Sequence, residues 1–135
     1  MNRGVNLPAV VTAALVNFFL QAAWFTAFKV PWIAGVGKTE AELLKSASAA
    51  PYIEAFVCNL LIAYVLAWVV QKTGEQTAGR GIKIGMFMWL GFVGTTMLTE
   101  LAFEARGLMF FGVVAGSPLF GMIFSGAIVG GWKKK

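Results

Sequence analysis

Glu100 and Glu104 stand four residues apart in the stretch "MLTELAFEARG", and Arg106 follows them. This stretch ends a segment that is otherwise apolar, where carboxylates are rare because a charge in hydrocarbon is unfavourable. Two chemistries suit such residues: ion pairs that join helix ends, or a protonatable or cation-binding group at the mouth of a pathway. Which of the two chemistries applies depends on the helices and turns that position these side chains.

The composition is that of a membrane protein. Of the 135 residues, 59% are hydrophobic and only 13% are charged, and the mean hydropathy is +0.76. Soluble domains carry about 25% charged residues. We therefore expect an integral membrane protein in contact with lipid.

The chain lacks the residue types on which common enzyme chemistry depends. It contains no histidine or aspartate, and Cys58 is its single cysteine. Zinc, haem and non-haem iron sites use these residues, and a catalytic triad needs a base beside its nucleophile. The sequence also has no phosphate-binding glycine loop. We expect no enzyme activity, no cofactor and no metal site.

Four apolar segments each come close to the ~20 residues that a helix needs to cross a ~30 Å hydrocarbon core. Because lipid offers the backbone no hydrogen-bond partners, such segments must be helical. The sequence predicts an all-α membrane protein with four transmembrane helices, in one domain over residues 1–135. The predicted spans are residues 8–28, 52–70, 84–103 and 108–132.

The longest connection lies between the first two predicted spans. Pro31 and the glycines after it are expected to end the first helix. Thr39 and Glu42 then form a capping box that starts a short helix through about Ser48. We expect this helix to lie on the outer membrane surface, as a connector that shields the end of the bundle.

Basic residues in the connections predict the orientation. One side holds seven of them and the other four, which favours cytoplasmic termini in the cell's inner membrane, with an inverted or dual topology still open. The terminal "GWKKK" suits anchoring to anionic lipid, and we expect no nucleic-acid partner. The seven are Arg3, Lys72, Arg80, Lys83, Lys133, Lys134 and Lys135, and the four are Lys29, Lys38, Lys45 and Arg106.

This topology brings three acids and two bases to the outer end of the bundle. With the third helix centred near Val93, Glu100 lies ~10 Å from the membrane midplane and should face protein or water. We favour ion pairs of Glu54 and Glu100 with Lys29 and Arg106; the alternative is Glu100 as an ion-pathway group. The candidate intramembrane polar cluster is Lys29, Glu54, Glu100, Glu104 and Arg106.

Other residues predict how the helices pack. Two amides share one face of the first helix, where interhelical hydrogen bonds typically contribute ~0.6 to 2 kcal/mol. Small residues four apart in the last segment predict close approach of another helix, from this chain or from a second copy. Pro118 should kink that segment. The candidate packing residues are Asn17, Gln21, Gly112, Gly116, Gly121, Gly126 and Gly130.

Several short motifs together resemble the small integral-membrane family catalogued as domain of unknown function 1761. The resemblance covers nearly the whole chain and implies a four-helix membrane fold without an assigned activity. It transfers no functional residues, and the chain has "QAAWF" where a Gly-Ala-Leu-Trp-Tyr type of string is expected. The motifs are Trp24, Phe25, Phe28, Pro31, Trp32, Gly37, "TEAEL", "YVLAW", "WLGFV" and "FEARG".

Three function classes follow from these observations. We favour a structural or accessory protein that packs against itself or a larger membrane complex. The alternative is a small oligomeric transporter or ion channel that uses Glu100, with two or more copies because four helices are too few to surround a pore. A membrane enzyme is the third class, and no nucleophile and base pair supports it.

Overall fold

The computed structural model describes residues 4–135, so Arg3, one of the basic residues counted above, lies outside the described residues. All regular structure in this part of the chain is helical, and four helices are long and apolar enough to cross a membrane, which confirms the predicted fold class. Three of these spans are single helices: α1 (Leu7–Ala27), α4 (Ala50–Lys72) and α7 (Leu108–Gly131).

The third span, Ala78–Phe103, is built from three consecutive pieces. It runs through α5 (Ala78–Met88), the π-helix η1 (Trp89–Gly94) and α6 (Thr95–Phe103). It begins at Ala78 rather than at residue 84 because the Thr77 side chain accepts a hydrogen bond from the backbone N–H of Arg80, 3.2 Å away. Hydropathy alone did not identify the helical turns before residue 84, since they carry Arg80 and Lys83.

The connection between α1 and α4 holds two short helices instead of the single one expected. Pro31 does not end the helical path, because α2 (Lys29–Val36) restarts after Phe28 and continues to Gly37, whose φ of 78° stops it. The predicted capping box is present in α3 (Glu40–Lys45), where the side chains and backbone N–H groups of Thr39 and Glu42 bond reciprocally. That helix ends at Lys45, earlier than Ser48.

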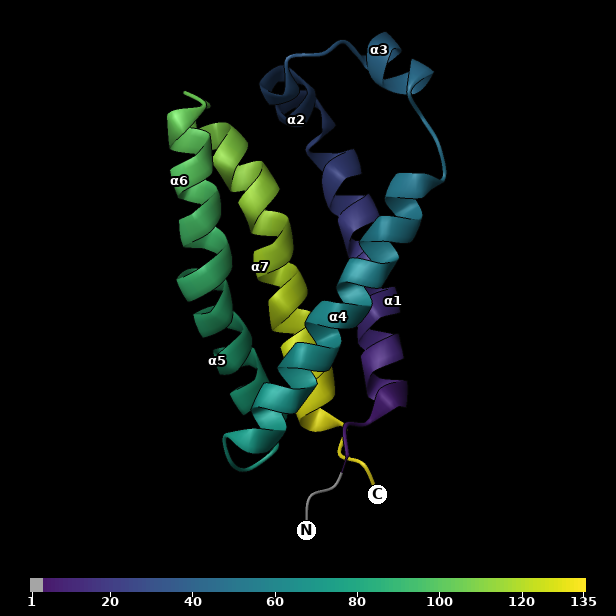
Figure 1. Ribbon diagram of the computed structural model, residues 1–135, viewed down its shortest axis with the longest axis vertical. Helices are drawn as coiled ribbons and strands as arrows, with labels where there is room; N and C mark the ends of the chain where they lie inside the picture. The colour runs from purple at the N-terminus through teal and green to yellow at the C-terminus, as the bar shows by residue number, and fades with distance from the viewer. Residues whose placement is uncertain (1–3) are drawn as a thin grey trace.

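The first described residues and the C-terminus lie at one end of the bundle, and α2 and α3 lie at the other (Figure 1). We call these the termini end and the α2–α3 end. Helix α7 packs against α1, α4 and α5, so it is the central element. The helices diverge towards the α2–α3 end, where α6 stands apart from α1 and α4 and packs mainly on α7 (Figure 1).

Glycines bring α5 and α7 into backbone contact. A Cβ atom added to Gly81 would overlap the carbonyl of Gly126, and one added to Gly126 would overlap the carbonyl of Gly81. The same holds for Gly85 against Met122 and for Gly130 against Thr77. We call these four residues the glycine seam: Gly81, Gly85, Gly126 and Gly130.

The apolar core lies beside this seam, towards the termini end. Leu66 and Val70 of α4 and Val129 of α7 are its largest fully buried apolar side chains. By contrast, Leu101 is the only buried residue of α6. The chain therefore packs tightly at the termini end and leaves α6 largely uncovered.

Candidate functional site

The two bases of the predicted polar cluster are paired with acids other than those expected. Lys29 pairs with Glu40 of α3, not with Glu54. The guanidinium of Arg106 lies 2.8 Å from the carboxylate of Glu104, so Glu104 is not simply solvated. These pairs form because α2 continues the chain past Lys29 and because Arg106 follows Glu104 in the same tight turn.

Arg106 also fastens the turn between α6 and α7 to α2. It donates a hydrogen bond of 3.0 Å to the carbonyl oxygen of Gly35, and its guanidinium lies 5.0 Å from the centre of the Phe110 ring, as in a cation–π contact. These contacts are largely solvent-exposed, where an ion pair contributes little, about 0 to 1 kcal/mol. Arg106 thus acts as a local brace.

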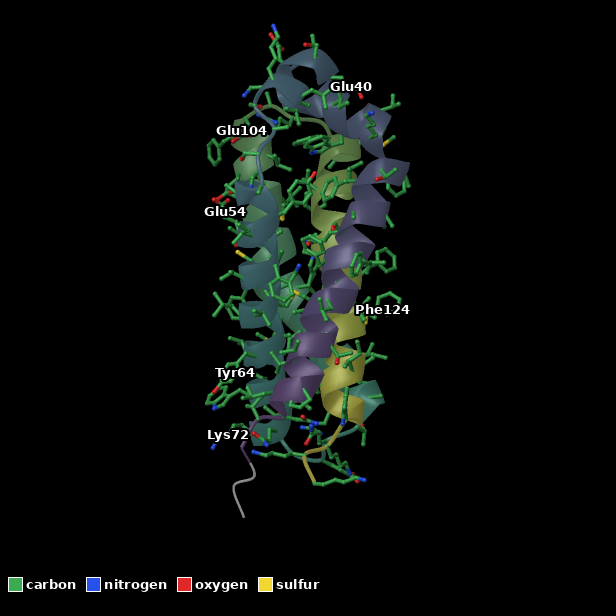
Figure 2. The ribbon with its side chains drawn as sticks, turned by 90° about the vertical axis from the view of Figure 1, so that its right-hand side faces the viewer. Glu40, Glu54, Tyr64, Lys72, Glu104 and Phe124 are labelled. Carbon is green, nitrogen blue, oxygen red and sulfur yellow. The ribbon has the colours of Figure 1, made fainter. Side chains whose placement is uncertain are left out.

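Glu54 and Glu100 are exposed, and neither forms an ion pair within residues 4–135. Figure 2 shows Glu54 and Glu104 at the same outer edge of the bundle, pointing away from its interior. Glu100 was expected to face the bundle interior or water, but its side chain is exposed and does not point into the bundle. Its carboxylate lies on the outer surface of α6.

Glu100 belongs to a continuous exposed stripe of aromatic and hydroxyl side chains. Residues at spacings of three and four share a helix face, and Phe92 and Phe103 on this face are 73% and 90% exposed. Each threonine hydroxyl of the stripe donates to the carbonyl four residues earlier, at 2.6 to 3.1 Å. We call this surface the α6 stripe: Phe92, Thr95, Thr96, Thr99, Glu100 and Phe103.

Glu100 is separated from the nearest other charged residue of its span by a long uncharged stretch. No charged residue lies between Lys83 and Glu100, and 17 residue steps (100 minus 83) at 1.5 Å each give roughly 26 Å. This is shorter than the ~30 Å hydrocarbon core. Glu100 therefore lies within the candidate span Ala78–Phe103, near the end opposite to Lys83.

A second polar site lies inside the bundle, between α1, α4 and α7. The Asn17 amide donates to the Ser125 hydroxyl at 2.8 Å, and the Asn59 amide donates to the Gln21 carbonyl oxygen at 2.8 Å. Asn17 thus links α1 to α7, and Gln21 links α1 to α4. These are interhelical hydrogen bonds of the kind expected for Asn17 and Gln21.

A small cavity of about 20 Å³ lies against this network, close to Pro118. Two buried acceptors on its wall, Asn17 Oδ1 and Ser117 Oγ, have no hydrogen-bond partner in the described chain. A cavity of this size and polarity suits one water molecule, which needs about 10–15 Å³ and two to four polar partners. The site is neutral, so it is poorly suited to an unpaired cation.

Two tryptophans donate hydrogen bonds to α7 in the turn before Pro118. Pro118 lies inside α7, where it has no N–H to donate. The indole of Trp24 donates to the carbonyl of Val113 at 2.8 Å, and that of Trp89 donates to the carbonyl of Ala115 at 2.9 Å. Trp89 is the first residue of the π-helix η1.

The predicted packing glycines fall into three groups. Gly126 and Gly130 belong to the glycine seam, while Gly116 lies under the Trp24 ring and Gly121 lies against the Asn17 side chain. An added Cβ at Gly112 would meet no atom within 4 Å. The glycine faces are thus used mainly within the chain.

Several residues of these sites were not among the predicted candidates. Gly81 and Gly85 stand four apart, and this small-xxx-small spacing is the signal that could have identified them. Asn59, Ser117 and Ser125 are polar residues inside apolar spans, which indicates interhelical hydrogen bonding. Trp89 belongs to the "WLGFV" motif of the family resemblance, but no packing role was predicted for it.

The capping box of α3 lowers the pKa of one carboxyl group. The backbone and side-chain hydrogen bonds from Thr39 hold the pKa of Glu42 below its ordinary value of 4.5. Among residues 4–135, no three His, Cys, Asp or Glu side chains gather as metal ligands would. The arrangement offers helix association, hydrogen bonding and, at Glu100, an exposed carboxylate without an ion pair in residues 4–135, within a candidate membrane span.

Comparison with known families agrees with the fold. The family described as "Protein of unknown function (DUF1761)" matches residues 8–130. The chain belongs to this family. Neither a curated protein nor a solved structure matches this DUF1761 chain significantly.

Proposed function

We propose that this DUF1761 protein is a non-enzymatic accessory subunit that joins a larger membrane complex through the α6 stripe. The observation that carries the proposal is the Glu100 carboxylate, which lies within the span, is exposed, and forms no ion pair within residues 4–135. A carboxylate in such a position normally faces protein or water. A partner helix that donates hydrogen bonds to the carboxylate would both cover it with protein and supply the missing polar partner.

The exposed rings on either side of Glu100 support a protein partner. Phe92 and Phe103 present large apolar surfaces at the ends of the stripe, and aromatic residues are enriched at protein interfaces. Thr95, Thr96 and Thr99 lie between them and allow a neighbouring helix to approach closely. The stripe thus combines two large apolar side chains with the Glu100 carboxylate, which a partner could bury.

Charge favours a different protein over a second copy. A two-fold dimer through this face would set each stripe against itself and bring the two Glu100 carboxylates to the same depth. The nearest bases of the chain are occupied, since Lys29 pairs with Glu40 and Arg106 with Glu104. We therefore expect a partner helix that carries a hydroxyl, amide or basic side chain opposite Glu100.

The same proposal includes the location of the protein. Six of the seven basic residues on the more basic side lie in the described chain, at or near the termini end, where anionic lipid and the positive-inside rule favour the cytoplasm. We place the protein in the cell's inner membrane with both termini cytoplasmic. A nucleic-acid partner is not part of this proposal, because the lysines sit at the membrane surface.

Native mass spectrometry of the protein, extracted with its surrounding lipid from its own membrane, tests the proposal. We expect the wild type in a complex with other subunits, and Glu100→Leu released from it. Glu100→Gln should retain most of the complex, because the amide still forms hydrogen bonds. Leu98→Ala, on another face of α6, is the matched control and should leave the complex intact.

Thermal unfolding of each variant in detergent separates assembly from folding, and all should melt at similar temperatures. A wild type found only as copies of itself, or a Glu100→Leu variant that keeps its partners, would contradict the proposal.

A transporter or channel built from two or more copies is the second candidate, because the same unpaired carboxylate would then line the contact between copies. Ion flux into liposomes tests it. Flux that is lost in Glu100→Gln, with assembly preserved, would favour this candidate. Loss of folding or assembly in Glu100→Gln would exclude it.

A further inference from the structure

An apolar groove lies on the membrane-facing surface where α5 and η1 meet α7. Its volume is about 300 Å³, and its wall includes Met86, Phe87 and Leu90 of the third span and Leu119 of α7. The volume is roughly twice the ~150 Å³ of an apolar cavity that holds benzene. Because its wall is apolar, the groove suits a hydrocarbon chain rather than water.

Trp89 gives the groove a fixed wall. Its indole is held by the hydrogen bond to the Ala115 carbonyl at 2.9 Å, and its ring also lines the groove. Two other residues of its wall, Phe87 and Leu90, are 73% and 56% exposed, so the groove opens towards lipid. A shape held by a hydrogen bond orders a bound chain at lower entropic cost than a flexible surface does.

Lys83 lies at the end of the groove nearest the termini. Lys83 and Leu90 are seven residue steps apart, so the groove extends roughly 10 Å along the helix axis. The hydrocarbon stem of Lys83 contributes to the apolar wall, and its ammonium is free to reach the headgroup region. Within residues 4–135, Lys83 forms no ion pair.

The other cation on this face of α5 is occupied. Arg80 donates to the carbonyl of Thr73, and its guanidinium packs over Gly74 in the turn before α5. This leaves Lys83 as the group that can meet an anion above the groove.

We propose that this groove binds one anionic phospholipid, with an acyl chain along Trp89, Leu90 and Leu119 and the phosphate at the Lys83 ammonium. The charge and the depth of Lys83 select this ligand class. A zwitterionic lipid fills the groove equally well but offers the ammonium no net negative charge. The groove shares no residue with the α6 stripe, and the proposal does not depend on the proposed partner complex.

The test is native mass spectrometry of the purified full-length protein with phosphatidylglycerol and phosphatidylcholine of identical acyl chains. We expect the wild type to retain one phosphatidylglycerol in preference to phosphatidylcholine. Lys83→Gln should lower this preference about fivefold, the contribution of one basic residue near an anionic headgroup. Lys133→Gln removes the same charge from the same end, away from the groove, and should leave the preference unchanged.

A second variant tests the acyl-chain part of the site. Leu119→Trp fills the groove and should weaken retention of both lipids without changing their ratio. Equal loss of preference in Lys83→Gln and Lys133→Gln would mean diffuse attraction to a basic surface and would overturn the proposal. An unchanged preference in Lys83→Gln would also overturn it, whether or not Leu119→Trp folds.

Discussion

The two ends of this bundle are built differently although the same helices run through both. At the termini end, α5 and α7 meet backbone to backbone along the glycine seam, beside the apolar core of Leu66, Val70 and Val129. At the α2–α3 end, the same span continues as α6, whose only buried residue is Leu101. The contrast separates the part of the chain that specifies the fold from the part that is free to contact other molecules.

The difference arises within a single span. Gly81 and Gly85 bring α5 against α7, and the π-helix η1 then changes the face that the following turns present. As a result, only 17% of the most apolar stretch of the third span is buried, against 39% for α7. Small residues therefore hold one half of the span inside the protein, and phenylalanine and threonine side chains cover the other half.

The largest effect is expected at the glycine seam. Gly81→Ala places a methyl group on the carbonyl of Gly126, so α5 and α7 must move apart. Overpacking of this kind costs typically 1–3 kcal/mol, and we expect the upper part of that range because the obstacle is backbone. The free energy of unfolding in detergent, measured by reversible denaturation, checks this.

Gly112→Ala is the matched control, the same chemical change at a glycine where an added Cβ meets nothing within 4 Å. It should be neutral or stabilise α7 by up to about 1 kcal/mol through helix propensity. Equal destabilisation by both substitutions would mean that the seam is not the feature that distinguishes the two ends.

The polar network near the bundle centre should show an intermediate effect. Asn17→Leu removes the hydrogen bond to Ser125, and interhelical hydrogen bonds in membranes contribute typically ~0.6 to 2 kcal/mol. Ser125→Ala should cost a similar amount, and the double variant should cost less than the sum because both remove the same bond. Strict additivity of the two free energies would contradict the network.

The sequence predicted most of the fold because hydropathy and capping act locally. The four spans follow from continuous apolar runs, and α3 follows from Thr39 and Glu42 alone. Helix α2 was not predicted, because Pro31 was expected to end the first helix. Pro31 is instead tolerated in the first turn of a new helix that starts after Phe28. Local signals could not show that restart.

The candidate site was harder to predict because its contacts join distant segments. The bases near the α2–α3 end were recognised, but Lys29 reaches Glu40 and Arg106 reaches Glu104, and these choices depend on the paths of α2 and the α6–α7 turn. A π-helix at Trp89–Gly94 precedes Glu100 in the same span, and a π turn shifts the face on which the following residues lie. Helical periodicity assumes 3.6 residues per turn and so cannot anticipate that change of face.

The smallest effect is expected at the surface of the α2–α3 end. The hydrogen bonds from Thr39 lower the pKa of Glu42 in the folded helix. A lowered folded-state pKa means that the capping box is fully stabilising above the ordinary value of 4.5 and is lost as the pH falls through the lowered pKa.

Hydrogen-exchange protection of the first turn of α3 should therefore decrease at acidic pH, while protection across the glycine seam stays constant. Glu42→Gln should make the protection of α3 independent of pH in this range. A parallel loss of protection at both ends of the bundle would show that they do not unfold independently.

The measurement that tests the central claim most directly is photo-crosslinking in the native membrane from a photoreactive residue at position 96, within the α6 stripe. A second protein, with the reactive residue at position 19 of α1, is the control, because Phe19 is also exposed, at 66%. The account predicts a product with one distinct membrane protein from position 96 only, and its loss when Glu100→Leu is added. A product with a second copy of this chain, or lipid adducts alone from both positions, would contradict the account.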